Sequence, residues 1–360
     1  MRVDPAQPTA AAFRQQIDRQ LDDFLAAKRG QLEAVSPTLG LLTDVAADLA
    51  AGGKRLRPAF AYWGHVAAAG NDQVPEALWP AISAIELLHV GVLVHDDVLD
   101  ESDTRRGRPA AHRQFEAWHR SQAPQGPSAE FGRKLAVLLG DQLLVWSDEL
   151  ARADRLGERA AGFWYAVRTE VNSGQVLDIC AQYRVGAPAG VSDEQVASQV
   201  LEEKTSRYTV QRPLQFGAAA GGASDQTLAA LGQYGQALGR AFQLRDDLLG
   251  IFAEQAQTGK PAAGDLREGK RTVLLARSLD GLAASDRAQL GDLLGREELD
   301  DDQIGLARAL MTASGAVEQI EQAILDDHAA ALAALDDARI SPAGHQALVE
   351  LARQCVERSY

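Results

Sequence analysis

The chain has 360 residues, of which 46% are hydrophobic, and this is enough apolar material for a large core in one or two domains. Its formal net charge is −14, and it has no basic stripe interleaved with aromatic residues. This pattern argues against nucleic acid as a partner, so an anionic ligand must be bound through metal ions or local groups of basic residues.

The N-terminal segment is predicted to be helical and not a signal peptide, because Asp4, Asp18, Asp22 and Asp23 interrupt it. No apolar run approaches the roughly 18–20 residues of a membrane span, and we therefore expect no stable membrane insertion. Two cysteines, Cys180 and Cys355, lack the spacing of metal ligands. Reduced thiols of this kind favour a cytoplasmic protein.

Apolar residues recur at helical spacing along the whole chain, whereas an alternating strand pattern and an internal repeat are missing from the sequence. The predicted helices, in chain order, span residues 10–28, 37–51, 55–70, 75–102, 109–120, 130–152, 157–184, 192–221, 225–254, 270–281, 285–294, 300–313, 314–338 and 341–357. Short Gly- and Pro-containing turns separate them, and none reads as an interdomain linker. We therefore predict a single all-α helical bundle over residues 1–360.

A basic turn precedes the third predicted helix, with the sequence Gly52-Gly53-Lys54-Arg55-Leu56-Arg57-Pro58. Lys54 and Arg57 are three residues apart and can converge on one anion, because arginine binds phosphate through paired hydrogen bonds and lysine acts as a compact charge. Taken alone, this motif would be interpreted as a solvated turn.

An acidic cluster, Asp96-Asp97-Val98-Leu99-Asp100, ends the strongly apolar helix predicted over 75–102. Asp96 and Asp100 share one face of a helix because they are four residues apart, and Asp97 lies at the edge of that face. Carboxylates this close repel one another unless a cation lies between them, and hard divalent cations prefer oxygen ligands.

A second acidic cluster, Asp246-Asp247, lies inside another apolar helical stretch, and Lys260 and Lys270 follow it. Arg105 and Arg106 similarly follow the first cluster. Metal-binding carboxylates beside phosphate-binding bases indicate a diphosphate site.

These motifs, in this order, resemble the trans-isoprenyl diphosphate synthases. The resemblance covers about residues 50 to 275 and rests on the two clusters, the basic turn and several shorter matches, namely Glu86-Leu-Leu-His89, Thr104-Arg-Arg-Gly-Arg-Pro109, Leu139-Gly-Asp141, Gly174-Gln-Val-Leu-Asp178, Glu203-Lys-Thr205, Phe242-Gln243, Gly259-Lys-Pro261 and Gly264-Asp-Leu-Arg-Glu-Gly-Lys-Arg-Thr272. It implies an all-α isoprenoid synthase fold around a deep central cavity.

The resemblance also implies a division of roles. The allylic diphosphate would be held by magnesium, with three ions per loaded site, on Asp96, Asp100 and Asp246, helped by Arg105, Lys204 and Lys260. Isopentenyl diphosphate would be held without metal by Lys54, Arg57, His89 and Arg106. The residues expected at the reacting centre are Asp96, Asp97, Asp100, Lys204, Thr205, Gln243 and Asp246, with Asp178 and Asp265 ordering waters around the metals.

One position departs from the family pattern, because Gly250 stands where many members have an aspartate. The second cluster therefore offers Asp246 and Asp247 only, and we leave Gly250 out of the expected site.

Product length is expected to depend on the helix that leads to Asp96. Gly91 and Val92 lie about one turn deeper than Asp96, and Leu88 lies one turn further. Relatives that stop at fifteen carbons commonly have an aromatic ring at one of the first two positions. Small residues there favour geranylgeranyl diphosphate, with some farnesyl diphosphate, and Gly91→Phe is expected to shorten the product.

The resemblance further implies a homodimer acting on dimethylallyl, geranyl and farnesyl diphosphates. The alternatives left open are a longer-chain synthase, a non-catalytic subunit of a heteromeric synthase and a class I terpene cyclase. A cyclase would typically carry a later Asn/Ser/Glu metal motif, which we do not find. A His-Asp phosphohydrolase is disfavoured because the seven histidines form no persuasive ligand set.

Overall fold

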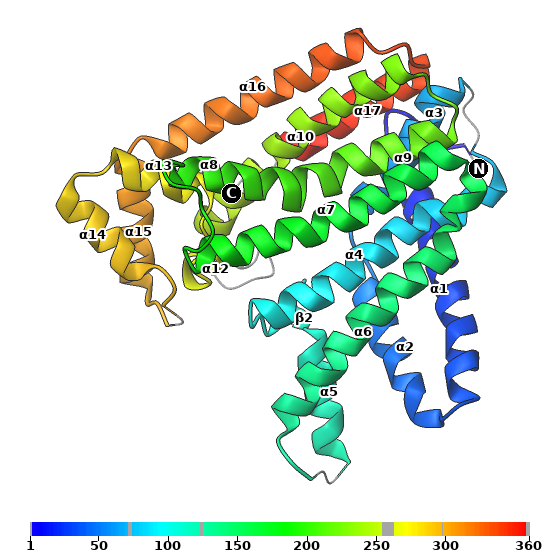
Figure 1. Cartoon of the computed structure of the whole chain (residues 1–360), viewed down its shortest axis with the longest axis horizontal. Coiled ribbons are helices and arrows are strands. Elements are labelled where there is room, and N and C mark those ends of the chain that lie inside the picture. The colour runs from blue at the N-terminus through cyan, green and yellow to red at the C-terminus, as the bar shows by residue number, and fades with distance from the viewer. Residues whose placement is uncertain (1, 71–73, 123–124, 254–262, 297, 358–360) are drawn as a thin grey trace.

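The computed structural model describes residues 2–70, 74–122, 125–253, 263–296 and 298–357 (Figure 1). Its first elements are α1 (Ala11–Glu33), η1 (Pro37–Leu39), α2 (Gly40–Ala50), α3 (Leu56–Ala69), η2 (Glu76–Leu78), α4 (Trp79–Leu99), β1 (Thr104–Arg105), β2 (Arg108–Pro109), α5 (Ala111–Ser121), α6 (Ser128–Ala151), η3 (Ala153–Leu156) and α7 (Glu158–Gln182). They are followed by α8 (Asp193–Val200), η4 (Leu201–Gln211), α9 (Arg212–Ala220), α10 (Asp225–Phe252), α12 (Gly264–Arg267), α13 (Val273–Gly281), α14 (Ala284–Leu293), α15 (Asp301–Ala313), α16 (Ala316–Asp336) and α17 (Pro342–Val356). The all-α prediction is confirmed.

The axes of the long helices α4, α6, α7 and α16 have a similar slope across the view (Figure 1). α4 packs on α6, α3 packs on α9, and α10 packs on η4 and α16. Apolar residues of α1, α3, α4, α6 and α7 form one core cluster, and those of α10 and α13 to α16 form another. Since α10 contributes to both clusters, it joins the two parts of the bundle.

The central helix α4 is apolar on all sides, and this composition predicts burial in a core. The stretch Glu76–Leu99 is in fact long and apolar enough to span a bilayer, which corrects our expectation that no run of that length exists. In the folded chain, 78% of the most apolar 18-residue part of this stretch is buried inside the protein. Its hydrophobicity is therefore accounted for by packing inside the protein.

One predicted helix is three segments. Residues 192–221, expected to be continuous, fold as α8, η4 and α9, and η4 is a π-helix. A π-helix widens the turn and changes which side chains share a face, so it commonly occurs at functional sites. The spacing of apolar residues in the sequence does not reveal this change, because all three segments are helical.

A short hairpin was also not expected. Thr104 pairs with Pro109 and Arg105 with Arg108, and the turn between them has positive φ at Arg106 (54°) and Gly107 (73°). Two positive φ angles are the requirement of a tight type I′ hairpin. The hairpin turns the chain back immediately after α4, and Arg105 and Arg106 thereby lie beside the acidic cluster.

Glycines allow two buried helices to make close backbone contact. A Cβ added to Gly64 on α3 would overlap Leu214 O on α9, and one added to Gly217 on α9 would overlap Ala61 O on α3. Each helix therefore meets the backbone of the other at a position where only glycine fits.

We predict that Gly64→Ala destabilises the protein by roughly 1–3 kcal/mol, since overpacking a buried contact forces the backbones apart. The matched control is Gly162→Ala on α7, where an added Cβ meets nothing within 4 Å. The control should be neutral or more stable by up to about 1 kcal/mol, because alanine is the better helix former. Urea unfolding followed by circular dichroism measures both, and equal stabilities for the two variants would contradict the close packing of α3 on α9.

Candidate active site

One cavity of about 780 Å³ receives most of the predicted site residues. It lies among the start of α3, the end of α4, the β1–β2 hairpin, α7, η4, α10 and the segment from α12 to α13. The predicted residues that line it are Lys54, Arg57, His89, Val92, Asp96, Arg105, Arg106, Asp178, Lys204, Thr205, Gln243, Asp246, Asp265 and Lys270. Segments far apart in the sequence thus contribute to one site.

The three aspartates of the first cluster have different surroundings. Asp96 lines the cavity, and its carboxylate accepts hydrogen bonds from Lys204 Nζ at 3.2 Å and Arg105 Nη2 at 3.2 Å. Asp100 is buried beside the cavity and pairs with Lys270 Nζ at 3.2 Å. Asp97 is 1% exposed, is not among the lining residues and accepts a 2.7 Å hydrogen bond from Arg105 Nε. Its position corrects the expectation that Asp97 lies at the reacting centre, because the carboxylate instead anchors Arg105.

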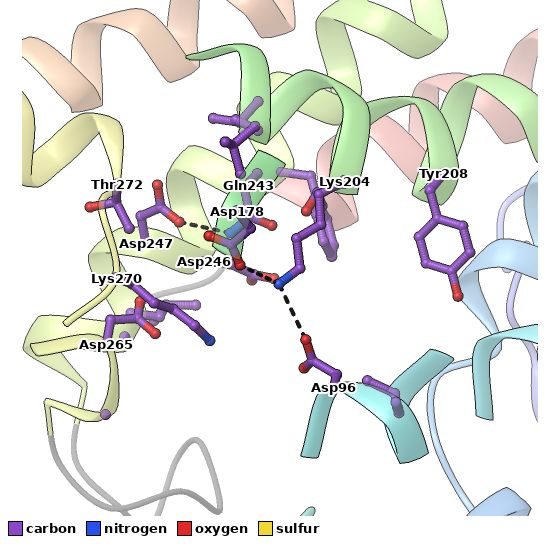
Figure 2. A pocket seen from close by; sticks show the side chains of 18 of the residues that line it. Asp96, Asp178, Lys204, Tyr208, Gln243, Asp246, Asp247, Asp265, Lys270 and Thr272 are labelled. Carbon is purple, nitrogen blue, oxygen red and sulfur yellow. Dashed lines mark hydrogen bonds and ion pairs between the residues drawn. The ribbon is translucent and has the colours of Figure 1, made fainter. Parts of the chain in front are cut away.

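Lys204 connects α4 with α7 across the cavity (Figure 2). Its ammonium donates to Asp178 Oδ2 at 2.6 Å as well as to Asp96. This reach depends on Gly174, because a Cβ there would overlap the backbone of Lys204. The glycine lets the π-helix η4 contact α7 directly, one turn away from Asp178.

The charges of the site stabilise one another. Burial alone would raise the pKa of Asp96, but the neighbouring Lys204, Lys270 and Arg105 hold it well below its usual range. Burial likewise opposes charge on Lys204 and Lys270, yet the adjacent carboxylates raise the pKa of both ammonium groups. Asp96 is therefore ionised and both lysines are protonated at neutral pH. For Asp100 the balance differs, because burial and then repulsion from Asp96 raise the pKa of its carboxyl.

The two aspartates of the second cluster both line the cavity, unlike those of the first, but they differ in burial. Asp246 is partly exposed, whereas Asp247 is 4% exposed and accepts a 2.7 Å hydrogen bond from Gln243 Nε2. Burial and repulsion from Asp265 raise the pKa of Asp247 well above its ordinary value. The amide nitrogen of Gln243 donates to Asp247, so the amide oxygen of Gln243 is the atom left to interact with a ligand in the cavity.

The departure at Gly250 has a structural counterpart. Gly250 lines the cavity, and a Cβ at this position would overlap Asp265 Oδ2. The carboxylate of Asp265 thus occupies the space beside α10 that a side chain at position 250 would fill. Our decision to leave Gly250 out of the acidic set agrees with this arrangement, and Asp265 is the third carboxylate next to Asp246 and Asp247.

A basic pocket lies on the other side of the cavity. Lys54, Arg57, His89 and Arg106 line it, and the Arg106 guanidinium lies against the backbone of Gly53, where a Cβ would be 2.8 Å from Nη1. Arg55, the remaining cation of the basic turn, does not line the cavity and forms a buried ion pair with Glu86 and a partly exposed one with Asp18. Arg55 therefore holds the turn in place instead of facing the cavity.

Sequence reasoning gave no role to several lining residues, among them Tyr208 and Arg271. Tyr208 follows Lys204 by four residues on η4, and its ring lies 4.6 Å from the Arg57 guanidinium. Tyr208 could have been predicted to share a helix face with Lys204, because the two residues are four apart. For Arg271 the sequence offered only its position next to Lys270. Lys260, which we expected to bind the allylic diphosphate, lies outside the described residues.

The chain-length residues are corrected by the structure. A Cβ on Gly91 would lie 3.1 Å from Leu143 Cβ and 3.3 Å from Gly140 O, both on α6. Gly91 therefore faces α6, and Phe at this position would disrupt helix packing before it could shorten a channel, so that expectation is wrong. Leu88 is fully buried and does not line the described cavity. Val92 does line it, together with Leu93, Val171 and Phe242.

The donor set fits magnesium. Carboxylates from α4, α7, α10 and α12 surround the acidic end of the cavity, and hard cations prefer such oxygen ligands. Within the described residues no three acidic, histidine or cysteine side chains are placed to hold a metal by themselves. Magnesium is usually bound by one or two carboxylates with substrate phosphates and water completing the shell, so an incomplete protein cage is expected here.

Comparison with known proteins identifies the family. The model of the family "Polyprenyl synthetase" matches residues 40–311. A short chain isoprenyl diphosphate synthase of Methanothermobacter thermautotrophicus is 29% identical over 77% of this chain and 78% of its own. A nonaprenyl diphosphate synthase of Mycobacterium tuberculosis is 31% identical over 73% of this chain and 71% of its own.

Among solved structures, a geranylgeranyl pyrophosphate synthase of Corynebacterium glutamicum, complexed with isoprenyl diphosphate and magnesium, superposes with a TM-score of 0.90. It is 35% identical, and the match covers 99% of this chain and 100% of that one. The family match spans the basic turn, both acidic clusters and the π-helix that together form the cavity. The chain therefore belongs to the polyprenyl synthetase family and is a prenyltransferase of the trans-isoprenyl diphosphate synthase type.

Proposed function

We propose that this enzyme condenses isopentenyl diphosphate with allylic diphosphates, using magnesium, and releases geranylgeranyl diphosphate as its main product with some farnesyl diphosphate. The observation that carries the proposal is the division of one cavity into two unlike ends. Around Lys204 and Lys270 the cavity combines carboxylates with lysines, whereas around Arg57 and His89 its polar lining is basic and aromatic. Two diphosphates with different binding requirements match these two ends.

The acidic end suits the allylic substrate. Magnesium held by Asp96, Asp100 and Asp246 would withdraw negative charge from the leaving diphosphate. Lys204 and Lys270 are protonated and already lie among these carboxylates, so their ammonium groups are available to the phosphate oxygens without large movement. Arg105 is held by Asp97 and adds a third fixed cation.

The middle of the cavity suits an allylic cation. Thr205 presents a hydroxyl from η4, and the amide oxygen of Gln243 is oriented by the bond between its nitrogen and Asp247. Dipoles oriented before the reaction stabilise developing positive charge at little reorganisation cost. The double bond of isopentenyl diphosphate then attacks the cation, and the proton lost from the new chain passes to the departed diphosphate.

The basic end suits isopentenyl diphosphate. Lys54, Arg57 and Arg106 supply cationic donors to its diphosphate, and His89 completes the pocket. This diphosphate is not a leaving group, because its C–O bond is not allylic and would break to an unstabilised primary cation. It therefore needs binding by arginine and lysine but no activation by metal.

The purified chain supplied with magnesium, labelled isopentenyl diphosphate and each of dimethylallyl, geranyl and farnesyl diphosphate should yield twenty-carbon alcohols after phosphatase treatment. Products longer than twenty carbons would favour the longer-chain alternative. The chain's similarity to a nonaprenyl diphosphate synthase is the reason to test for them. No consumption of isopentenyl diphosphate by the chain alone would overturn the proposal in favour of a non-catalytic subunit or a cyclase.

In the same assay Val92→Phe should shift the main product to fifteen carbons, because Val92 lines the cavity one turn below Asp96 and a ring there fills tail space. The matched control is Val98→Phe, which adds the same volume to α4 at a position that does not line the cavity. An unchanged product from a folded, active Val92→Phe enzyme would show that the tail does not pass this residue.

Asp96→Asn and Asp246→Asn should each lower turnover by about 10²- to 10³-fold, since each removes charge that stabilises metal at the leaving group. Both should also weaken binding of Mn²⁺, used as a spectroscopic substitute, in the presence of inorganic diphosphate. The control is Asp141→Asn, an exposed carboxylate on α6 outside the cavity, which should leave both measurements unchanged. Normal metal binding by the two cavity variants would contradict the assigned metal ligands.

We also propose that the enzyme is a cytoplasmic homodimer. Val137, Leu138 and Val145 on α6 are 43%, 59% and 58% exposed, and Leu138 and Val145 share a face because they are seven residues apart. Leu99, at the end of the neighbouring helix α4, is 51% exposed. A second copy that packs its own α6 on this surface would bury it in an isologous interface. The thiols of Cys180 and Cys355 are not joined in a disulfide, as suits a reducing compartment.

Sedimentation of the purified chain at micromolar concentration should therefore give about twice the chain mass of 38.5 kDa. Leu138→Arg should shift the chain towards monomer, because a charge would be buried at the interface. Leu325→Arg on α16, where the leucine is equally 59% exposed, is the control and should remain dimeric. A stable, active monomer of the parent chain would exclude the proposed interface.

A further inference from the structure

Three residues on three different helices form a connected group in the basic pocket: Arg57 on α3, His89 on α4 and Tyr208 on η4. Arg57 Nη1 is 3.2 Å from His89 Nε2, and His89 Nδ1 is 2.9 Å from the Tyr208 hydroxyl. The ring of Tyr208 also lies 4.6 Å from the Arg57 guanidinium. Each member therefore contacts both of the others. Figure 2 shows Tyr208 on η4 well apart from the acidic residues.

The chemistry of arginine determines where the proton on His89 lies. A guanidinium can only donate hydrogen bonds, so the Nε2 atom that faces Arg57 must accept and carries no proton. Neutral imidazole then carries its proton on Nδ1, which donates to the oxygen of Tyr208. The environment supports the neutral form, since burial and then the charge of Arg57 lower the pKa of His89 well below its ordinary value.

The same bonds determine what Arg57 can offer to a ligand. Its guanidinium has five N–H groups. One Nη1–H is bonded to His89, and one Nη2–H is bonded to Thr209 Oγ1 at 2.8 Å, while Nε is buried and has no hydrogen-bond partner. Two fixed bonds and the ring of Tyr208 hold the plane of the guanidinium. Because Nε–H is buried, the second N–H of Nη1 and the second N–H of Nη2 are the donors that remain for an anion in the pocket.

We propose that Tyr208 is a positioning residue, which holds His89 as the Nδ1–H tautomer and thereby orients Arg57 to bind the non-reacting diphosphate. The inference rests on the proposed function for the identity of that diphosphate. Tyr208 acts through its hydroxyl on His89 and through its ring on Arg57, and Tyr208→Phe removes the first contact while retaining the second. Without the hydroxyl, the Nδ1–H loses its acceptor, the other tautomer becomes competitive, and its Nε2–H opposes the N–H of Arg57.

The first test reads the tautomer without substrate, by ¹H–¹⁵N spectra of the histidine rings at pH 7.5, with His89→Asn used to assign the signal. The parent should show a protonated Nδ1 and a bare Nε2 on His89, and Tyr208→Phe should show a mixture. An imidazolium or a protonated Nε2 in the parent would overturn the proposal. The matched control is Tyr234→Phe, which removes another buried hydroxyl, bonded to Leu348 O at 2.7 Å outside the cavity, and should leave the spectrum unchanged.

The second test measures the consequence for binding. Tyr208→Phe should raise the KM for isopentenyl diphosphate by roughly three- to tenfold, the effect of one lost hydrogen bond, with kcat and the KM for the allylic substrate within about twofold. It should weaken binding of inorganic diphosphate in EDTA by the same factor. In an Arg57→Met background it should add no further loss, because residues that act through one another are not additive.

A KM for isopentenyl diphosphate that matches the Tyr234→Phe control, or a full additional loss in the Arg57→Met background, would overturn the positioning role. The tautomer and inorganic diphosphate measurements require no prenyl transfer. A chain that passes both but consumes no isopentenyl diphosphate would support the positioning inference while overturning the proposed function.

Discussion

The site depends on one constraint, which is that carboxylates from separate helices are buried together in one cavity. Such groups repel one another and lose hydration, so the arrangement requires cations among them. Lys204 provides one by bonding both Asp96 on α4 and Asp178 on α7, and Lys270 provides another beside Asp100. The lysines therefore hold the helix ends together, and the same positive charges lie where a substrate diphosphate would bring its oxygens.

The backbone is adapted to this arrangement. The π-helical turns of η4 direct Lys204, Thr205 and Tyr208 into the cavity, and Gly174 lets η4 approach α7 closely enough for Lys204 to reach its partners. Gly250 likewise leaves room for Asp265, so a carboxylate from α12 completes the second acidic cluster. In the basic pocket, neutral His89 and aromatic Tyr208 orient the charge of Arg57 instead of adding to it.

Much of the fold could be predicted from the sequence, because apolar residues at a 3.6-residue period produce helices regardless of what they pack against. The ends of the helix predicted over 75–102 fall within a few residues of α4, and those over 225–254 match α10 closely. The π-helix over 201–211 was not predicted, since the apolar spacing of this segment does not distinguish it from an α-helix, and it packs between α7 and α10. The short hairpin formed by Thr104–Arg105 and Arg108–Pro109 was missed, because strands of two residues are too short to show an alternating apolar and polar pattern.

For the site, the sequence by itself determined which charges gather, because the acidic clusters and the basic turn carry their chemistry in residue type and local spacing. Only the tertiary structure decided which members face the cavity. Asp96 and Asp97 are adjacent in sequence, yet a helix turns neighbouring residues about 100° apart, so one lines the site and the other anchors Arg105. Gly91 was misassigned for the same reason, since its open side is filled by α6. Tyr208 was overlooked because its role is a contact with His89 across 119 residues of chain, and no local pattern records which helices become neighbours.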